Sequence, residues 1–191
     1  MSVLHPIISV TGSSGAGTTS VRNVFEQIFR REKVTAAYLE GDSFHRYDRA
    51  EMKAKMSEAA AAGNNHFSHF SPETNLLQEL QDVFASYSET GRGKHRHYIH
   101  DEAEAELYGA KQGTFTDWQD LPAPTDILLY EGLHGAVKHE DVDTGLHADI
   151  KIGVVPVINL EWIQKIHRDK GARRYTTEDV MDTILRRMPP P

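Results

Sequence analysis

Hydrophobic residues occur along this chain in two patterns, short continuous runs and stripes that recur every three or four residues. Continuous runs are typical of strands in a parallel sheet, which are buried on both faces. They predict four strands: one that begins at Ile7, then Val34–Leu39, Ile127–Gly132 and Asp149–Val157. A further short strand is expected around Tyr98.

The stripes predict helices between these strands. The first lies directly after the first strand, where apolar residues from Val21 to Phe29 form one face between polar neighbours. Ser71-Pro72-Glu73 resembles a helix start with a serine cap, followed by a stripe from Leu76 to Tyr87. Other helices are expected over Asp48–Ala62, Asp101–Tyr108 and Asn159–Lys170, and after a cap at Thr176. Alternating strands and helices predict an α/β domain with three layers around a mostly parallel sheet.

A glycine-rich loop connects the first strand to the first helix. It matches the phosphate-binding pattern G-x-x-x-x-G-K-[ST] except that Thr18 occupies the position of the lysine. Backbone N–H groups of such a loop and the following helix N-terminus bind phosphate oxygens, and the Thr19 hydroxyl can ligate magnesium. The loop predicts nucleotide binding by Gly12, Ser13, Ser14, Gly15, Ala16, Gly17, Thr18, Thr19 and Ser20. An ordinary glycine-rich turn is the alternative.

Composition narrows the class of protein. The 191 residues are about one domain, and a net charge of −7 argues against a general nucleic-acid binder. No apolar stretch is long enough to cross a membrane, and no export signal is apparent, so a cytoplasmic protein is expected. The absence of cysteine excludes disulfides and thiol catalysis. Two basic groups, around His45–Lys53 and Lys165–Arg174, favour a small phosphorylated ligand over a polymer.

Two carboxylates follow predicted strands, Asp42 after the second and Glu131 at the end of the 127–132 run. The carboxyl ends of parallel strands meet at one edge of the sheet, where ligands bind. Phosphoryl transfer needs magnesium ligands, cations and a carboxylate that orients the acceptor. Glu131 is placed to bind magnesium and Asp42 to reach an acceptor hydroxyl, although a solvated carboxylate is the alternative for either alone. Lys165 lies in the best candidate segment to replace the missing loop lysine.

Five segments resemble phosphoribulokinase of the proteobacterial type, and together they span nearly the whole chain. They are Gly12–Ser20, Glu40–Arg46, His66–Ser71, Tyr130–Val137 and Val154–Asp169. The resemblance implies a P-loop NTPase-like fold and phosphorylation of ribulose 5-phosphate by MgATP, giving ribulose 1,5-bisphosphate for carbon fixation in the Calvin cycle. Bacterial members of that family also lack the loop lysine.

The resemblance also implies roles for individual residues. Asp42 would be the catalytic base and a candidate metal ligand with Thr19 and Glu131, and Lys165 and Arg168 would contact the transferred phosphoryl group. Asp169 falls in the same motif and counts as a catalytic candidate. The sugar phosphate would be held by His45, Arg49, Lys53, His100 and Arg173. Arg31 resembles a residue of the allosteric effector site.

Members of this family continue for about a third of their length beyond the Arg186-Arg187-Met188 region. We therefore expect residues 1–191 to be a single P-loop kinase domain that lacks the C-terminal part of the family fold. A homo-oligomer like those of the family is expected only for the full-length form. Two alternatives stay open: a kinase similar to uridine kinase or pantothenate kinase, and an inactive fragment that binds nucleotide.

Overall fold

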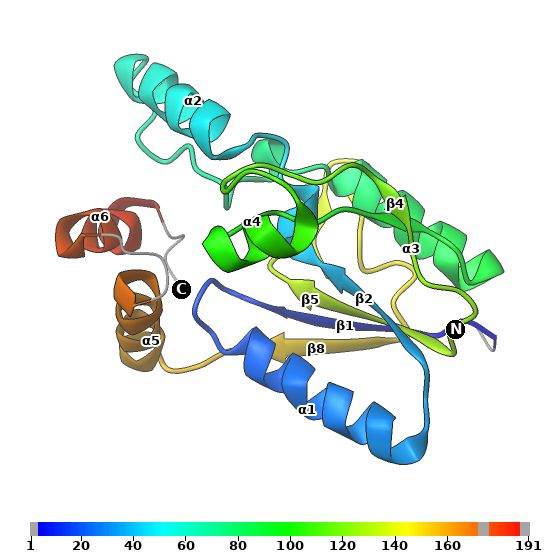
Figure 1. The fold of residues 1–191 in the computed structure, drawn as a ribbon. Coiled ribbons are helices and arrows are strands. Elements are labelled where there is room, and N and C mark those ends of the chain that lie inside the picture. Colours follow the sequence, from blue (N-terminus) through cyan, green and yellow to red (C-terminus); the bar gives the residue numbers. More distant parts are fainter. Residues whose placement is uncertain (1–3, 172–175, 188–191) are drawn as a thin grey trace.

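The computed structural model of the chain describes residues 4–171 and 176–187. Its central sheet has four parallel strands in the spatial order β2-β5-β1-β8. The predicted three-layer α/β arrangement around a parallel sheet is confirmed (Figure 1). The strands are β1 (Ile7–Gly12), β2 (Ala36–Glu40), β5 (Ile127–Gly132) and β8 (Ile150–Val154).

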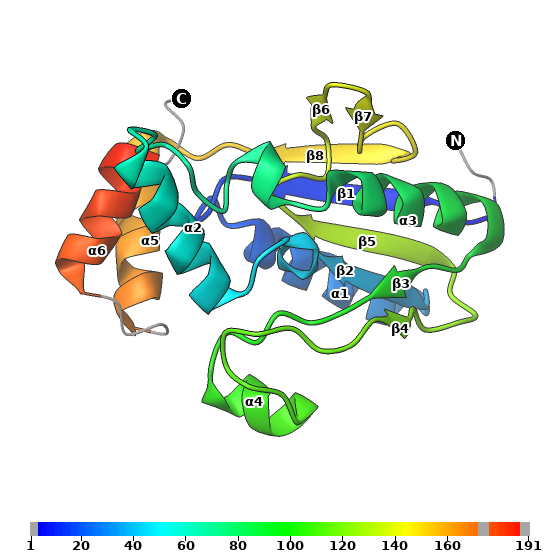
Figure 2. The ribbon, with the colours of Figure 1, turned by 90° about the horizontal axis from the view of Figure 1, so that it is seen from above.

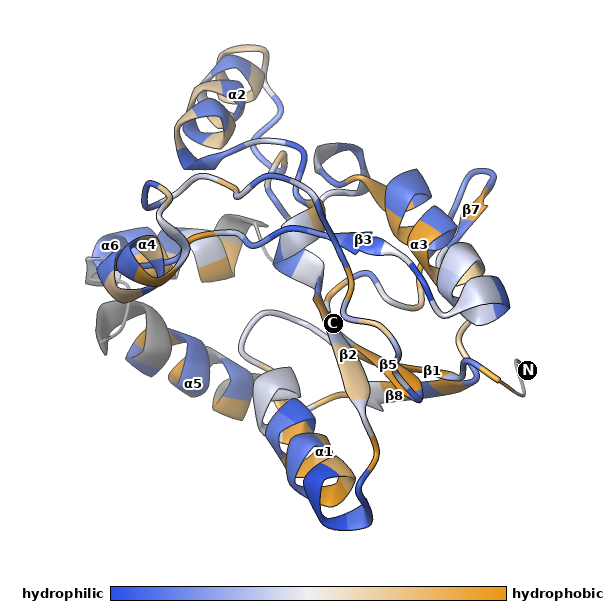
Figure 3. Ribbon diagram, turned by 45° about the vertical axis from the view of Figure 1, so that its right-hand side comes forward, coloured by the Kyte–Doolittle hydropathy of each residue, from blue (hydrophilic) through white to orange (hydrophobic). Residues whose placement is uncertain are grey.

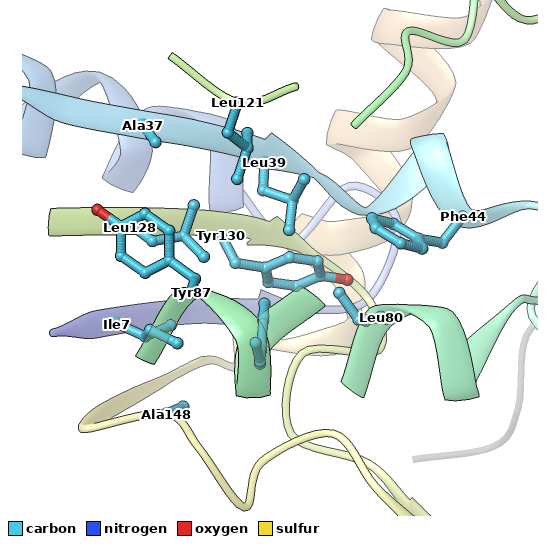
Figure 4. Close-up of a cluster of buried hydrophobic side chains, with 11 residues drawn as sticks. Ile7, Ala37, Leu39, Phe44, Leu80, Tyr87, Leu121, Leu128, Tyr130 and Ala148 are labelled. Carbon is cyan, nitrogen blue, oxygen red and sulfur yellow. The ribbon is translucent and has the colours of Figure 1, made fainter. Parts of the chain in front are cut away.

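Two helices cover the opposite faces of the sheet. The helix α1 (Thr18–Glu32) packs its apolar stripe on one face, where Phe29 joins Val10 and Leu129 in a buried cluster. The helix α3 (Leu77–Thr90) covers the other face, where Leu80 joins Tyr130 in a buried cluster (Figure 4). The Phe84 ring packs edge-on against Tyr130 in the same cluster. Figure 3 shows the apolar strands enclosed between helices whose outer surfaces are hydrophilic. Burying both faces of the sheet explains why its strands are continuously apolar.

Local capping explains where several other helices begin. Asp48 caps α2 (Arg49–Ala61) by accepting hydrogen bonds from two N–H groups of the first turn, and Glu51 accepts from the Asp48 N–H in return. Asp101 caps α4 (Glu102–Tyr108) through the Glu104 N–H. Thr176 caps α6 (Thr177–Asp182), as the sequence predicted. The remaining helices are α5 (Ile158–Gly171) and η3 (Thr183–Arg187).

Three expectations about local structure were wrong or inexact. The Ser71-Pro72-Glu73 signal begins a separate 3₁₀ turn, η2 (Pro72–Thr74), because Asn75 returns to an extended conformation before α3 starts at Leu77. Tyr98 forms an isolated bridge with Phe115 rather than a strand. The last strand, β8, ends at Val154, since the proline two residues later has no N–H to donate.

Two small antiparallel pairs were not predicted, because strands of two residues are too short to carry a hydrophobic period. They are β3 (Lys94–His95) with β4 (Gln119–Asp120), and β6 (Lys138–His139) with β7 (Val142–Asp143) (Figure 2). Over the part of the chain that the structure describes, no helix is long and apolar enough to cross a bilayer. The carboxyl ends of the four parallel strands meet at one edge of the sheet, and α5 lies at that edge (Figure 1).

Candidate active site

The glycine loop between β1 and α1 has the backbone conformation of a phosphate-binding turn. Gly15 and Gly17 adopt positive φ angles of 102° and 97°, which side-chain-bearing residues rarely adopt. Gly17 stands at the N-cap of α1 with no side chain to cap it, so the first N–H groups of the helix point into the loop. At Gly12, an added Cβ would lie 2.7 Å from the Val154 carbonyl oxygen of β8. Gly15 and Gly17 are therefore required by their backbone conformation, and Gly12 by its close approach to β8.

Glu131 joins this loop from the end of β5. Its carboxylate accepts a hydrogen bond from the Thr18 hydroxyl, and the Thr19 hydroxyl lies 3.4 Å from the same oxygen. Burial raises the pKa of Glu131, and the bond from Thr18 opposes that shift. Thr18 occupies the lysine position of the motif and donates a hydrogen bond to the carboxylate at the end of β5.

A lysine of α5 approaches the loop, where Thr18 stands at the lysine position of the motif. Lys165 is only 3% exposed, and its Nζ lies 3.3 Å from Ser14 Oγ and 5.8 Å from the centre of the Phe70 ring. The Ser13 hydroxyl donates to the Glu161 carboxylate, one turn earlier on the same helix. Gly15 permits this approach, since a Cβ there would meet Lys165 Cβ at 3.1 Å. Lys165 therefore lies at the loop, and its role there stays a prediction.

Asp42 lies in a short 3₁₀ turn, η1 (Gly41–Phe44), that follows β2. Two imidazoles flank its carboxylate: His45 Nε2 is 3.3 Å from one oxygen and His100 Nε2 is 3.4 Å from the other. The pKa of His45 is raised: burial lowers it, but the hydrogen bond and charge of Asp42 outweigh burial. The structure thus brings together three residues that the sequence analysis assigned to the acceptor end of the reaction.

The position of Asp42 depends on residues that the sequence analysis missed. The Arg96 guanidinium donates to the Ser43 and His45 carbonyls at 2.8 and 2.7 Å, and it stacks 3.7 Å from the centre of the Phe115 ring. Arg96 therefore fixes both sides of the turn that carries Asp42. Its place in the alternating basic and aromatic run before His100 was the only signal in the sequence.

Residues 7–190 match the Phosphoribulokinase / Uridine kinase family. The chain belongs to this family.

The curated relatives are phosphoribulokinases. The chain is 68% identical over 185 residues to phosphoribulokinase of Nitrobacter vulgaris, covering 97% of this chain and 64% of that protein. It is also 68% identical over 189 residues to phosphoribulokinase of Xanthobacter flavus, covering 99% of this chain and 65% of that protein. The solved structure of phosphoribulokinase from Rhodobacter spheroides superposes with a TM-score of 0.82 at 56% identity, covering 97% of this chain and 63% of that one.

These matches confirm the resemblance to phosphoribulokinase and the expected fold. They also show that the chain spans about two thirds of the length of its relatives.

Three residues to which the family resemblance assigns a role have side chains outside the described part of the chain. Arg168 and Asp169 belong to α5, but their side chains fall outside the described part of the chain. Arg173 lies outside the described residues altogether. The expected roles of these three residues stay predictions.

The other implied residues lie on α1 and α2. Arg49 at the start of α2 donates to the Tyr98 hydroxyl at 3.3 Å and to the His100 carbonyl at 3.0 Å, so it connects α2 to the Asp42 site. Lys53 lies one turn further along α2 and is exposed. Arg31 is exposed near the end of α1 opposite the glycine loop and pairs with Glu32. Arg31 is therefore separated from the loop by most of the helix, and its expected effector role stays a prediction.

Proposed function

We propose that this chain transfers the terminal phosphoryl group of ATP to D-ribulose 5-phosphate, giving ribulose 1,5-bisphosphate, the step that prepares the sugar for carbon fixation in the Calvin cycle. The main support is the arrangement of Asp42, Glu131 and Lys165 around the glycine loop, in a chain 68% identical to phosphoribulokinases. We place the reaction in the cytoplasm.

The residues around the loop fit a magnesium ion. Thr19 and Glu131 offer a hydroxyl and a carboxylate whose oxygens converge at 3.4 Å. Mg²⁺ prefers hard oxygen ligands, and it is commonly held by one or two carboxylates together with substrate phosphates. Asp42 is another carboxylate at this edge, and after burial its charge also raises the pKa of Glu131. When bound, the ion would neutralise charge that develops on the phosphates.

On the nucleotide side, the chain's own groups bind and orient the phosphates. The N–H groups at the start of α1 donate to phosphate oxygens, assisted by the positive end of the helix dipole. Lys165 approaches the same loop and supplies the positive charge near the phosphoryl group in transfer. Because Lys165 is buried against Phe70, its charge acts in a site where water screens it little.

On the acceptor side, Asp42 takes the proton from the attacking hydroxyl. Its carboxylate is suited to this role, because it follows β2, the strand next to β5, whose Glu131 it influences electrostatically. His45 and His100, on the two oxygens of Asp42, provide donors for the sugar phosphate. Arg49 is connected to the His100 backbone and brings a planar cation suited to phosphate recognition.

A substrate comparison tests this proposal. Turnover of the 191-residue chain is measured with MgATP and ribulose 5-phosphate, uridine or pantothenate, and Asp42→Asn serves as the inactive control. We expect ribulose 5-phosphate to be phosphorylated with a higher kcat/KM than either alternative. Preference for uridine or pantothenate would contradict the proposal and favour a related small-molecule kinase.

A binding measurement separates the remaining alternative. A ligand present at a hundred times its dissociation constant stabilises the native state by about 2.7 kcal/mol, which a thermal shift detects. Stabilisation by MgATP without turnover of any of the three acceptors would identify a nucleotide-binding fragment. Stabilisation by MgATP together with turnover of ribulose 5-phosphate would support the proposed function.

A further inference from the structure

Asn75 is a buried polar residue in the acceptor site to which the family resemblance gives no role. It is 3% exposed and lies between η2 and α3, beside the turn that carries Asp42. Its backbone forms an antiparallel bridge with His45, flanked by a 2.7 Å hydrogen bond from the Leu76 N–H to the Phe44 carbonyl. The two segments are therefore held together before any side chain is considered.

The contacts of the Asn75 amide determine which way it points. Its Nδ2 lies 3.0 Å from the His69 carbonyl oxygen and 2.8 Å from that of Ser71. Carbonyl oxygens only accept hydrogen bonds, so the NH₂ group must face them. The flipped amide would place its oxygen against two other oxygens. Asn75 Oδ1 therefore faces the remaining neighbour, His45 Nδ1, at 2.8 Å.

This orientation determines which nitrogen of His45 carries a hydrogen. Asn75 Oδ1 can only accept, so His45 Nδ1 must donate. The ring then directs Nε2 toward Asp42, 3.3 Å away. Asn75 Oδ1 and the Asp42 carboxylate both accept, and a neutral ring can donate to only one of them, so both contacts are complete only in the imidazolium. The other ring neighbours, His69 and Tyr98, make edge contacts at 5.9 and 6.1 Å between centroids, which do not select a ring flip.

We propose that Asn75 is a positioning residue for the acceptor substrate: its amide, locked by two backbone carbonyls, holds His45 by Nδ1 and so presents Nε2 to Asp42 and the sugar phosphate. A buried partner that fixes the orientation of a histidine ring through its other nitrogen is a known device in metal and catalytic sites. The role of Nε2 toward the sugar phosphate rests on the proposed function, whereas the orientation of the ring does not.

Nuclear magnetic resonance tests whether His45 Nδ1 carries the hydrogen that the contact with Asn75 requires. The chain is labelled with ¹⁵N-histidine, the His45 signals are assigned with His45→Gln, and long-range ¹H–¹⁵N correlations report which ring nitrogen is protonated. We expect a protonated Nδ1 in the unsubstituted chain. An unprotonated Nδ1 in this spectrum would overturn the proposal. The measurement needs no folded Asn75 variant and no turnover.

Kinetics test the consequence for substrate binding. A hydrogen bond that positions a side chain contributes about 1 kcal/mol, and its loss weakens substrate binding by about that amount. Asn75→Ala should therefore raise the KM for ribulose 5-phosphate about fivefold or more, with little change in the KM for ATP. The matched control is Thr74→Val. Thr74 is also buried, and its hydroxyl lies 2.8 Å from the Ser68 and Ser71 carbonyl oxygens of the same segment. It also lies 3.3 Å from Asn75 Nδ2, which keeps both of its carbonyl acceptors in the variant. The control should affect both KM values alike.

A double-mutant cycle shows whether Asn75 acts through His45. In a His45→Gln background, Asn75→Ala should cause no further loss in kcat/KM for the sugar. Full additivity of the two substitutions, or the same KM pattern in Thr74→Val, would assign Asn75 to segment stability and overturn the proposal. A chain that turns over no substrate would contradict the proposed function alone, because the spectrum still reports whether His45 Nδ1 is protonated.

Discussion

Lys165 Nζ lies 3.3 Å from Ser14 Oγ, although 151 residues separate the two along the chain. Lys165 enters the glycine loop from α5, while the loop's own lysine position holds Thr18, whose hydroxyl is engaged by Glu131. A positive charge therefore reaches the loop from a helix at the carboxyl edge of the sheet. In the usual motif the lysine belongs to the loop itself. Here a threonine occupies that position, and the lysine at the loop belongs to α5.

Lys165→Met should lower kcat by about 10²–10³-fold while changing the dissociation constant of MgATP much less. The reason is that a preorganised cation stabilises charge that develops mainly in the transition state. Single-turnover kinetics and nucleotide titration measure the two quantities. Lys55→Met, which removes an exposed lysine of α2 paired with Glu58, is the control and should leave both unchanged.

Thr18→Lys in the Lys165→Met background should restore only part of the lost turnover. A lysine at position 18 regains a cation in the loop, but it removes the hydroxyl that donates to Glu131. If Lys165→Met alone loses nothing, another group supplies the charge and the assignment of Lys165 is wrong.

Asp42→Asn should lower kcat by about 10²–10⁴-fold, the range typical of a general base, while nucleotide binding stays nearly intact. The amide keeps the size of the side chain and loses the ability to take a proton. Initial rates with ribulose 5-phosphate, together with MgATP titration, check this expectation. Wild-type turnover in this variant would exclude Asp42 as the base.

Gly41→Ala should destabilise the fold by about 1–3 kcal/mol and also reduce activity. A Cβ at Gly41 would lie 2.6 Å from the Tyr130 hydroxyl and 2.9 Å from Gly132 Cα, so the end of β2 would have to move, and Asp42 with it. The matched control is Gly153→Ala in β8, where an added Cβ meets nothing within 4 Å. Urea unfolding of both variants tests this, and equal stability would contradict it.

His134→Gln should flatten the dependence of stability on pH between about pH 5 and 7. Burial lowers the pKa of His134, an effect that its bond to the Phe70 carbonyl opposes and the charge of His45 reinforces. The unfolded chain, with a histidine pKa of about 6.5, then binds more protons than the native state in the window below that value. The free energy of unfolding therefore rises with pH through this window and falls as the solution becomes acidic.

Urea midpoints at several pH values measure this slope for the wild type and for His134→Gln. His139→Gln, in the exposed β6–β7 hairpin, controls for the loss of a surface imidazole. A slope in His134→Gln as steep as in the wild type would show that His134 does not contribute to the acid sensitivity of the fold.

Much of this architecture could be predicted from the sequence because its signals are local. The run at Ile127–Gly132 predicted β5 with the same bounds, and Thr176 predicted the start of α6. The loop from Gly12 to Thr19 was recognisable because its glycines and hydroxyls have a fixed spacing. Local signals failed at Ser71-Pro72-Glu73, where a good helix start produced one isolated turn because the bridge between Asn75 and His45 holds the chain extended.

The sequence by itself determined the four strands of the central sheet, the main helices, the glycine loop and the two carboxylates that follow strands, since each depends on neighbours within a few residues. Only the tertiary structure decided how Lys165 meets Ser14, how His45 and His100 flank Asp42, and how Arg96 and Asn75 hold the turn. These contacts join residues distant in the sequence, and hydrogen-bond direction at buried carbonyls selects one arrangement. No spacing pattern along a single chain encodes which carbonyl an amide will face.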